Sequence, residues 1–123
     1  MNALLKAKSA YAAAKAPTRT ARNTEYEILA RITRRMIAAH NKGADGFNDL
    51  ASAVSDNRRL WMLFTSDLAK SGNKLPSELK ASLLELGQFT RVHTSKVLAR
   101  KASVEPLVDI NTAIMRGLRS GAS

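Results

Sequence analysis

Apolar residues in this chain of 123 residues recur at steps of three and four, and this spacing constrains the fold more than any other feature. The step matches the turn of an α-helix and gathers apolar side chains on one face. No stretch alternates apolar and polar residues with enrichment in β-branched types, and no Asn-Gly or Asp-Gly pair joins two strand-like segments. We therefore predict an all-α fold, a small bundle of four to five helices with a mobile N-terminal helix or arm.

The first residues form the predicted arm. Residues 2–15 are rich in Ala, Leu and Lys, which favour a helix, and Pro17 ends it. So short an Ala-rich helix is marginal in water, so we expect it to be mobile. Residues 17–20 then form a linker. The predicted domains are a basic N-terminal helix and linker (1–23), a helical bundle (24–119) and a frayed tail (120–123).

Capping residues mark the first helix of the bundle. Thr24 and Glu27 have the spacing of a capping box, which predicts that a helix begins at Thr24. Gly43 then supplies a left-handed stop. Between these signals one apolar stripe follows the helical repeat, and its members are Leu29, Ile32, Met36 and Ala39.

The stretch from Phe47 to about Lys70 predicts one bent helix or two abutting helices, with an internal cap at Ser55 or Asp56 and a stop at Gly72. Two more helices are predicted after it. The longer one covers residues 76–99, with a proline in its first turn, and the last one begins after a cap at Ser103.

The chain is strongly basic, with 20 Lys and Arg against 10 Asp and Glu and a formal net charge of +10. Residues 1–42 hold nine basic and two acidic residues, whereas residues 43–73 are close to neutral and contain the only tryptophan. Such a charge indicates an anionic partner, which could be a nucleic acid, a lipid surface or an acidic protein.

Several function classes find no support in the sequence. Without cysteine the chain can form neither disulfides nor thiolate metal sites, and its two histidines, His40 and His93, lack a carboxylate at helical metal-binding spacing. No P-loop or catalytic triad pattern occurs. The apolar run 60–64 is too short to cross a membrane, and lysines interrupt any secretory signal. We expect a cytoplasmic protein that is not an enzyme and needs no cofactor.

Arginine clusters are the candidate binding residues. Arg58 and Arg59 precede Trp61, and guanidiniums bind phosphate while an indole can stack on a base. Trp61 also fits the apolar stripe, which places it in the core or in a groove. A second basic cluster falls at residues 31–35, where a plain solvated face is the alternative. The candidate partner-binding residues are Arg31, Arg34, Arg35, Asn57, Arg58, Arg59, Trp61 and Arg116.

Seven short segments carry a resemblance to a known family. They are Ala-Pro-Thr-Arg-Thr (16–20), Thr-Glu-Tyr-Glu (24–27), Arg-Ile-Thr-Arg-Arg (31–35), Asn-Arg-Arg-Leu-Trp (57–61), Phe-Thr-Arg (89–91), Lys-Val-Leu (96–98) and Ile-Asn-Thr-Ala-Ile-Met-Arg-Gly-Leu (110–118). In this order they resemble FlaF, the flagellar biosynthesis regulators of alphaproteobacteria. Gln88 departs from the acidic residue expected there, and Thr94-Ser95 replace a more basic pair.

The resemblance implies a cytoplasmic, non-enzymatic protein that promotes flagellin synthesis or secretion and acts opposite FlbT, which restrains translation of flagellin mRNA. A small bundle can expose an apolar groove for an amphipathic helix, and the ends of flagellin are such helices. We therefore expect a flagellin export chaperone, a monomer or weak dimer without membrane contact. The alternative is an RNA-binding regulator of flagellin mRNA, although the aromatic-basic interleaving of RNA modules is lacking.

Overall fold

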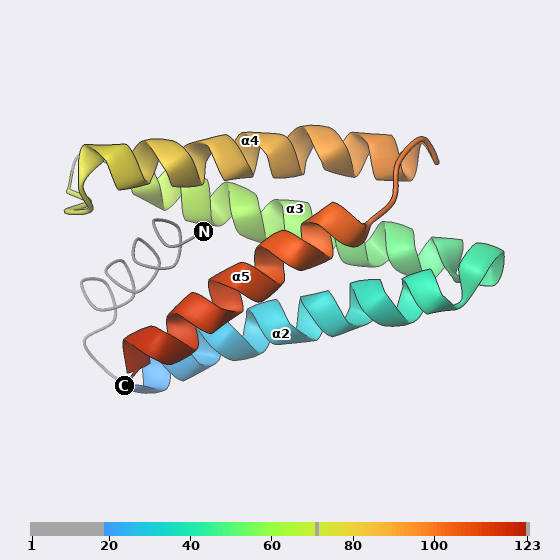
Figure 1. Ribbon diagram of the computed structural model, residues 1–123, viewed down its shortest axis with the longest axis horizontal. Coiled ribbons are helices and arrows are strands. Elements are labelled where there is room, and N and C mark those ends of the chain that lie inside the picture. Colours follow the sequence, from blue (N-terminus) through green and yellow to red (C-terminus); the bar gives the residue numbers. More distant parts are fainter. Residues whose placement is uncertain (1–18, 71, 123) are drawn as a thin grey trace.

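Four α-helices and one short 3₁₀ helix make up most of the residues that this computed structural model describes, 19–70 and 72–122 (Figure 1). Within these ranges no strand occurs. The all-α prediction is confirmed, while the helix predicted over residues 2–15 lies outside the described part. The elements are α2 (Arg19–Asn41), η1 (Gly43–Gly46), α3 (Phe47–Leu68), α4 (Ser77–Leu98) and α5 (Glu105–Ala122).

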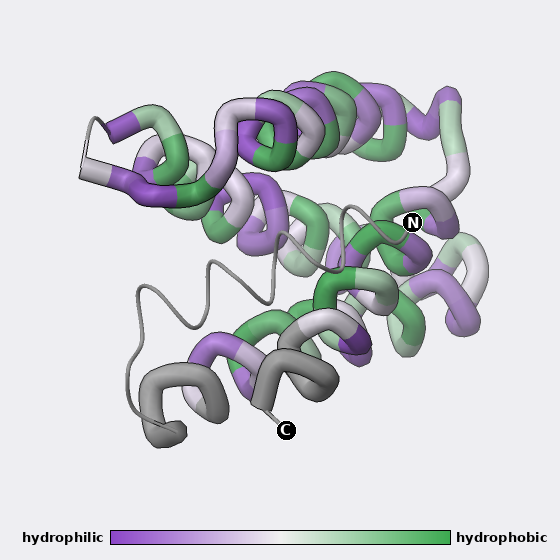
Figure 2. The backbone as a smooth tube through the Cα atoms, turned by 60° about the vertical axis from the view of Figure 1, so that its left-hand side comes forward, coloured by the Kyte–Doolittle hydropathy of each residue, from purple (hydrophilic) through white to green (hydrophobic). Residues whose placement is uncertain are grey.

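Consecutive helices run in opposite directions. η1 joins α2 to the antiparallel α3, and α4 returns along the other side of α3 (Figure 1). α5 then crosses diagonally over α2, and it packs against α2 more extensively than against α4. Along each helix, hydrophilic and hydrophobic residues alternate in short bands, as an amphipathic helix requires (Figure 2). Of the described helices, α3 makes most of the contacts with α4.

The start of α2 differs from the prediction. The helix begins at Arg19, so Arg19 and Thr20 are helical and not part of a linker. Thr24 therefore lies inside the helix, and the predicted capping box does not mark its start. The physical reason is that the Arg and Ala of residues 19–22 favour the helix and nothing interrupts it before Thr24. At the other end, Gly43 has φ 66°, which confirms the left-handed stop.

α3 is one continuous helix from Phe47 to Leu68. No second helix begins at Ser55 or Asp56, because a residue that can cap a helix start is also tolerated on an exposed helical face. α3 ends at Leu68, four residues before the stop predicted at Gly72. The helix instead ends in a tightened last turn, where the Lys70 amide donates to the Asp67 carbonyl three residues back (3.2 Å).

The prediction for residues 76–99 is confirmed by α4, but the way this helix ends was not predicted. Arg100 adopts φ 61°, the left-handed conformation in which glycine is usual. Its amide donates to the Val97 carbonyl (3.0 Å), and the amide of Lys101 donates to that of Lys96 (2.8 Å), which together form a Schellman motif. The Arg100 guanidinium lies 4.0 Å from the centroid of the Phe47 ring.

The predicted cap of the last helix is confirmed. The Glu105 amide donates a hydrogen bond to the Ser103 hydroxyl (3.1 Å), and α5 begins at Glu105. At its far end α5 extends through Ala122, so most residues of the predicted frayed tail are helical.

The core consists of two apolar clusters along the bundle. One gathers around Trp61 and joins α3, α4, α2 and α5, and the other surrounds Met36 near the η1 end. Burying each large side chain contributes about 1.5–3 kcal/mol to folding. The buried members of the first cluster are Leu29, Trp61, Leu68, Leu75, Leu83 and Ile114; those of the second are Ile32, Met36, Ala53, Val54, Val97, Val104 and Leu107.

A buried polar network passes through this core. The side-chain amide of Asn111, which is 0% exposed, donates to Asn57 Oδ1 (2.7 Å) and to Thr33 Oγ1 (3.1 Å). Its Oδ1 accepts a hydrogen bond from Trp61 Nε1 (3.0 Å), and Thr33 in turn donates to the carbonyl of Leu29 (2.7 Å). Because these residues come from α2, α3 and α5, the network joins three helices in one register.

We predict that Asn111→Ala lowers the free energy of unfolding by about 3 kcal/mol, because it leaves the Trp61 N–H and two acceptors without their buried partner. Asp109→Ala, at an exposed position on the same helix, should change it by less than about 0.5 kcal/mol. Chemical denaturation of both variants measures the difference. Equal, small effects would show that the network does not contribute to stability.

The Schellman motif generates a second prediction. Arg100→Gly removes the steric cost of a side chain at positive φ, whereas Arg100→Ala keeps that cost, and both lose the contact with Phe47. The glycine variant should therefore be more stable than the alanine variant by about 1 kcal/mol. Thermal and urea denaturation compare the two, and a more stable alanine variant would contradict the left-handed assignment.

Candidate functional site

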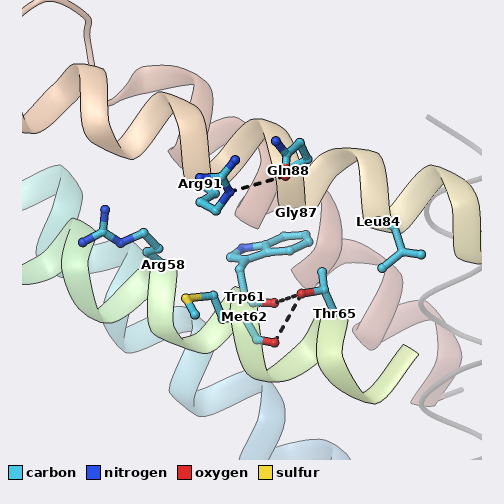
Figure 3. Close-up of a pocket in the computed structure, with 8 residues that line it drawn as sticks. All are labelled: Arg58, Trp61, Met62, Thr65, Leu84, Gly87, Gln88 and Arg91. Carbon is cyan, nitrogen blue, oxygen red and sulfur yellow. Dashed lines mark hydrogen bonds between the residues drawn. The ribbon is translucent and has the colours of Figure 1, made fainter. Parts of the chain in front are cut away.

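A pocket of about 290 Å³ opens between α3 and α4 (Figure 3). Such a volume is at the small end for a ligand pocket and suits one or two side chains of a partner. The residues that line it are Arg58, Trp61, Met62 and Thr65 from α3, and Leu84, Gly87, Gln88 and Arg91 from α4.

Close contact between the two helices forms one wall of the pocket. A Cβ atom added to Gly87 would collide with the Cγ2 methyl of Thr65. Thr65 has little freedom to turn away, because its hydroxyl donates to the carbonyl of Trp61 (2.9 Å) (Figure 3). The glycine thus lets α4 approach α3 more closely than any other residue would.

Trp61 forms the floor of the pocket. Its indole is only 4% exposed, and it packs edge-on against Phe64 with ring centroids 5.5 Å apart. The Nε1–H bond to Asn111 fixes the ring from the core side. Of the two placements that the sequence left open, the structure therefore shows a core residue whose ring reaches the pocket. The indole face is not available to stack on a base.

Exposed apolar side chains flank this floor. Met62 is 56% exposed and Leu84 37%, and both line the pocket. Large apolar residues this exposed are informative when they adjoin a concave surface, because folding alone would bury them. Leu63 on α3 and Phe89 and Val92 on α4 are also exposed, but they do not line the pocket.

One end of the pocket is cationic. Arg58 from α3 and Arg91 from α4 both lie at the end away from Leu84, as Figure 3 shows. The Nε–H of Arg91 donates to Gln88 Oε1 at 3.4 Å, a weak contact with a neutral group. None of the residues that line the pocket is acidic, so neither guanidinium is neutralised there.

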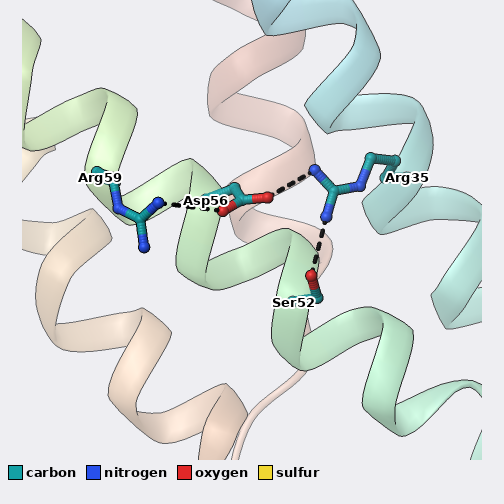
Figure 4. Close-up of polar contacts among 4 residues, drawn as sticks. All are labelled: Arg35, Ser52, Asp56 and Arg59. Carbon is teal, nitrogen blue, oxygen red and sulfur yellow. Dashed lines mark hydrogen bonds and ion pairs between the residues drawn. The ribbon is translucent and has the colours of Figure 1, made fainter.

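Two other candidate arginines, Arg35 of α2 and Arg59 of α3, both pair with Asp56 of α3. Arg35 Nη1 lies 2.8 Å from Asp56 Oδ2, and Nη2 donates to the Ser52 hydroxyl (3.1 Å) (Figure 4). Arg59 reaches the other oxygen of Asp56 at 3.7 Å. Arg35 is therefore a bridge between helices rather than a free cation, although a half-exposed ion pair of this kind adds only about 0–1 kcal/mol.

The remaining candidates are dispersed. Arg31 and Arg34 are exposed on α2, and Arg116 is exposed on α5; none of the three lines the pocket. Asn57 is a correction, because its side chain is fully buried in the polar network and touches no surface that a partner could reach. Among the eight candidates, only Arg58 and Trp61 meet at the pocket.

Sequence reasoning missed the α4 side of the pocket, including Leu84, Gly87 and Arg91. A glycine inside a long amphipathic stretch is the signal that could have found it, because such a residue often marks a close backbone approach.

Elsewhere the electrostatics are local. The Lys42 ammonium donates to Asp49 Oδ2 (2.9 Å), and this hydrogen bond, with the charge attraction, holds the pKa of Asp49 below its ordinary value.

Among the described residues no group of His, Asp and Glu is placed to hold a metal ion. None of the described helices has the length and apolar character needed to span a membrane.

Comparison with known proteins gives one match. The family model described as flagellar protein FlaF matches residues 7–118, which include all the residues that line the pocket. No curated protein and no solved structure matches the chain.

We predict that Gly87→Ala destabilises the protein by about 1–3 kcal/mol, because the new methyl overlaps that of Thr65. Thr65→Ser removes the colliding methyl and keeps the hydroxyl, so it should restore most of the loss when combined with Gly87→Ala. A double-mutant cycle of unfolding free energies measures this coupling. Purely additive effects would contradict direct contact at this crossing.

Proposed function

Because the chain belongs to the FlaF family of flagellar proteins, we propose that it is a non-enzymatic cytoplasmic chaperone that binds flagellin and promotes its synthesis or secretion. The observation that carries this proposal is the pocket between α3 and α4, where Met62 and Leu84 are exposed beside a preformed floor. The proposal includes a functional link to FlbT and action as a monomer or weak dimer.

The α3–α4 face suits an amphipathic helix. Two antiparallel helices with exposed apolar residues form a groove in which a third helix can insert one apolar side chain and cover its neighbours. Burying Met62 and Leu84 in this way would contribute roughly 1.5–3 kcal/mol each before the entropic cost of association. Flagellin with its terminal helices is the partner whose chemistry fits both this groove and the family.

RNA binding finds less support. Arg31 and Arg34 offer exposed positive charge, which any polyanion attracts. Recognition of single-stranded RNA also needs exposed aromatic faces, and Trp61 is buried while Phe89 is already stacked on His93 at 5.1 Å.

Salt dependence tests the proposal. We predict that the affinity for purified flagellin changes less than about tenfold between about 50 and 200 mM salt, because apolar burial is barely screened. Binding through several phosphates would instead lose orders of magnitude over this range. Fluorescence anisotropy with labelled flagellin, and separately with labelled flagellin mRNA leader, measures both. Tight, salt-sensitive RNA binding without flagellin binding would overturn the chaperone proposal.

Surface substitutions locate the interaction. Leu84→Asp should weaken flagellin binding about tenfold or more, because it places a charge against the apolar segment of the client. Ile37→Asp is the matched control, since Ile37 is 42% exposed on α2 and lies outside the pocket. Both variants should fold, which circular dichroism checks. Equal loss in both would place the flagellin site elsewhere.

A further inference from the structure

The pocket between α3 and α4 has two chemically different ends, and this asymmetry carries an inference about what binds there. Resting on the proposed function, we infer that Arg58 and Arg91 form a carboxylate-binding clamp, which selects client helices that bear an Asp or Glu next to the apolar anchor. The pocket thus recognises an apolar residue and an acidic residue together.

No acidic residue of the pocket neutralises the positive charge of the clamp. In the described part of the chain, neither Arg58 nor Arg91 takes part in an ion pair, and the nearby Asp56 is already paired with Arg35 and Arg59. Two guanidiniums beside an apolar cavity repel each other and favour an anion between them. A carboxylate can accept hydrogen bonds from both, and such charge-assisted bonds are about twice as strong as neutral ones.

The length of the pocket sets the spacing between the acidic residue and the apolar anchor on the client helix. Along α3 the lining runs from Arg58 to Thr65, and along α4 from Leu84 to Arg91. Each span of seven residues is about 10 Å, or two helical turns. A client helix lying along the groove therefore presents its acidic residue one or two turns from the side chain that contacts Met62 and Leu84.

The walls distinguish a carboxylate on a helix from a nucleic-acid phosphate. Next to the clamp lie Met62 and the edge of the buried Trp61, which offer apolar contact and no exposed ring face. A nucleotide would place a polar sugar against these groups without a stacking partner. An amphipathic helix places an apolar side chain there instead.

Removal of the clamp charge tests the inference. The probes are labelled synthetic peptides of the two terminal helices of flagellin, without tryptophan, and binding is measured by anisotropy and by the emission of Trp61, the single tryptophan of the chain. We expect Arg58→Gln with Arg91→Gln to weaken binding by about tenfold or more. Arg31→Gln with Arg34→Gln removes the same charge outside the pocket and should change binding less than about threefold.

A charge exchange provides the positive test. Protein with Arg58→Glu and Arg91→Glu should no longer bind the native peptide. It should instead bind a peptide whose acidic residues are replaced by lysine. If wild-type protein binds the peptides, and the Arg58→Gln/Arg91→Gln variant binds them as well as the Arg31→Gln/Arg34→Gln variant does, the clamp is overturned while the proposed function stands. If wild-type protein binds neither the peptides nor whole flagellin, the proposed function is overturned, and the clamp with it.

Discussion

The side-chain amide of Asn111 is the contact on which the rest of the bundle depends. From α5 it bonds to both α2 and α3, through Thr33, Asn57 and Trp61. Apolar side chains tolerate sliding of one helix along another, whereas a buried amide satisfies its bonds in one register only. One buried donor, Nδ2 of Asn57, still lacks a partner in the described part, so the network favours a unique arrangement more than maximal stability.

The same contact connects the core with the surface. The bond from Asn111 orients the indole of Trp61, and that indole is the floor of the pocket between α3 and α4. The pocket beside the exposed Met62 and Leu84 therefore has a floor whose orientation is fixed by α5, through Asn111. Such preorganisation lowers the entropic cost of binding, because the client meets a cavity that already has its shape.

Local patterns predicted the helices and some of their ends, although the capping signals at Thr24 and at Ser55 or Asp56 fall inside α2 and α3. The stop at Gly43 and the cap at Ser103 depend on neighbouring residues only, and both were predictable. The end of α4 was not, because an arginine, Arg100, occupies the position where a glycine is the usual signal.

The site was half predictable for a different reason. Arg58 and Trp61 stood out by composition, but Arg91 meets them only through the packing of α4 on α3, and nothing in a single sequence reports which helices are neighbours. The burial of Asn57 has the same origin, since its partner Asn111 lies 54 residues away in the chain. Asn57 resembled a surface residue in the sequence because Arg58 and Arg59 directly follow it.

The crossing of α3 and α4 at Thr65 and Gly87 leaves no space for even a methyl group, because the Thr65 side chain already lies against Gly87. The side chains at such a contact set the distance between the two helix axes. Arg58 and Arg91 lie one to two helical turns from this contact, within α3 and α4. The contact of Gly87 with Thr65 thus also sets how far apart the α3 and α4 backbones that carry the two arginines stand.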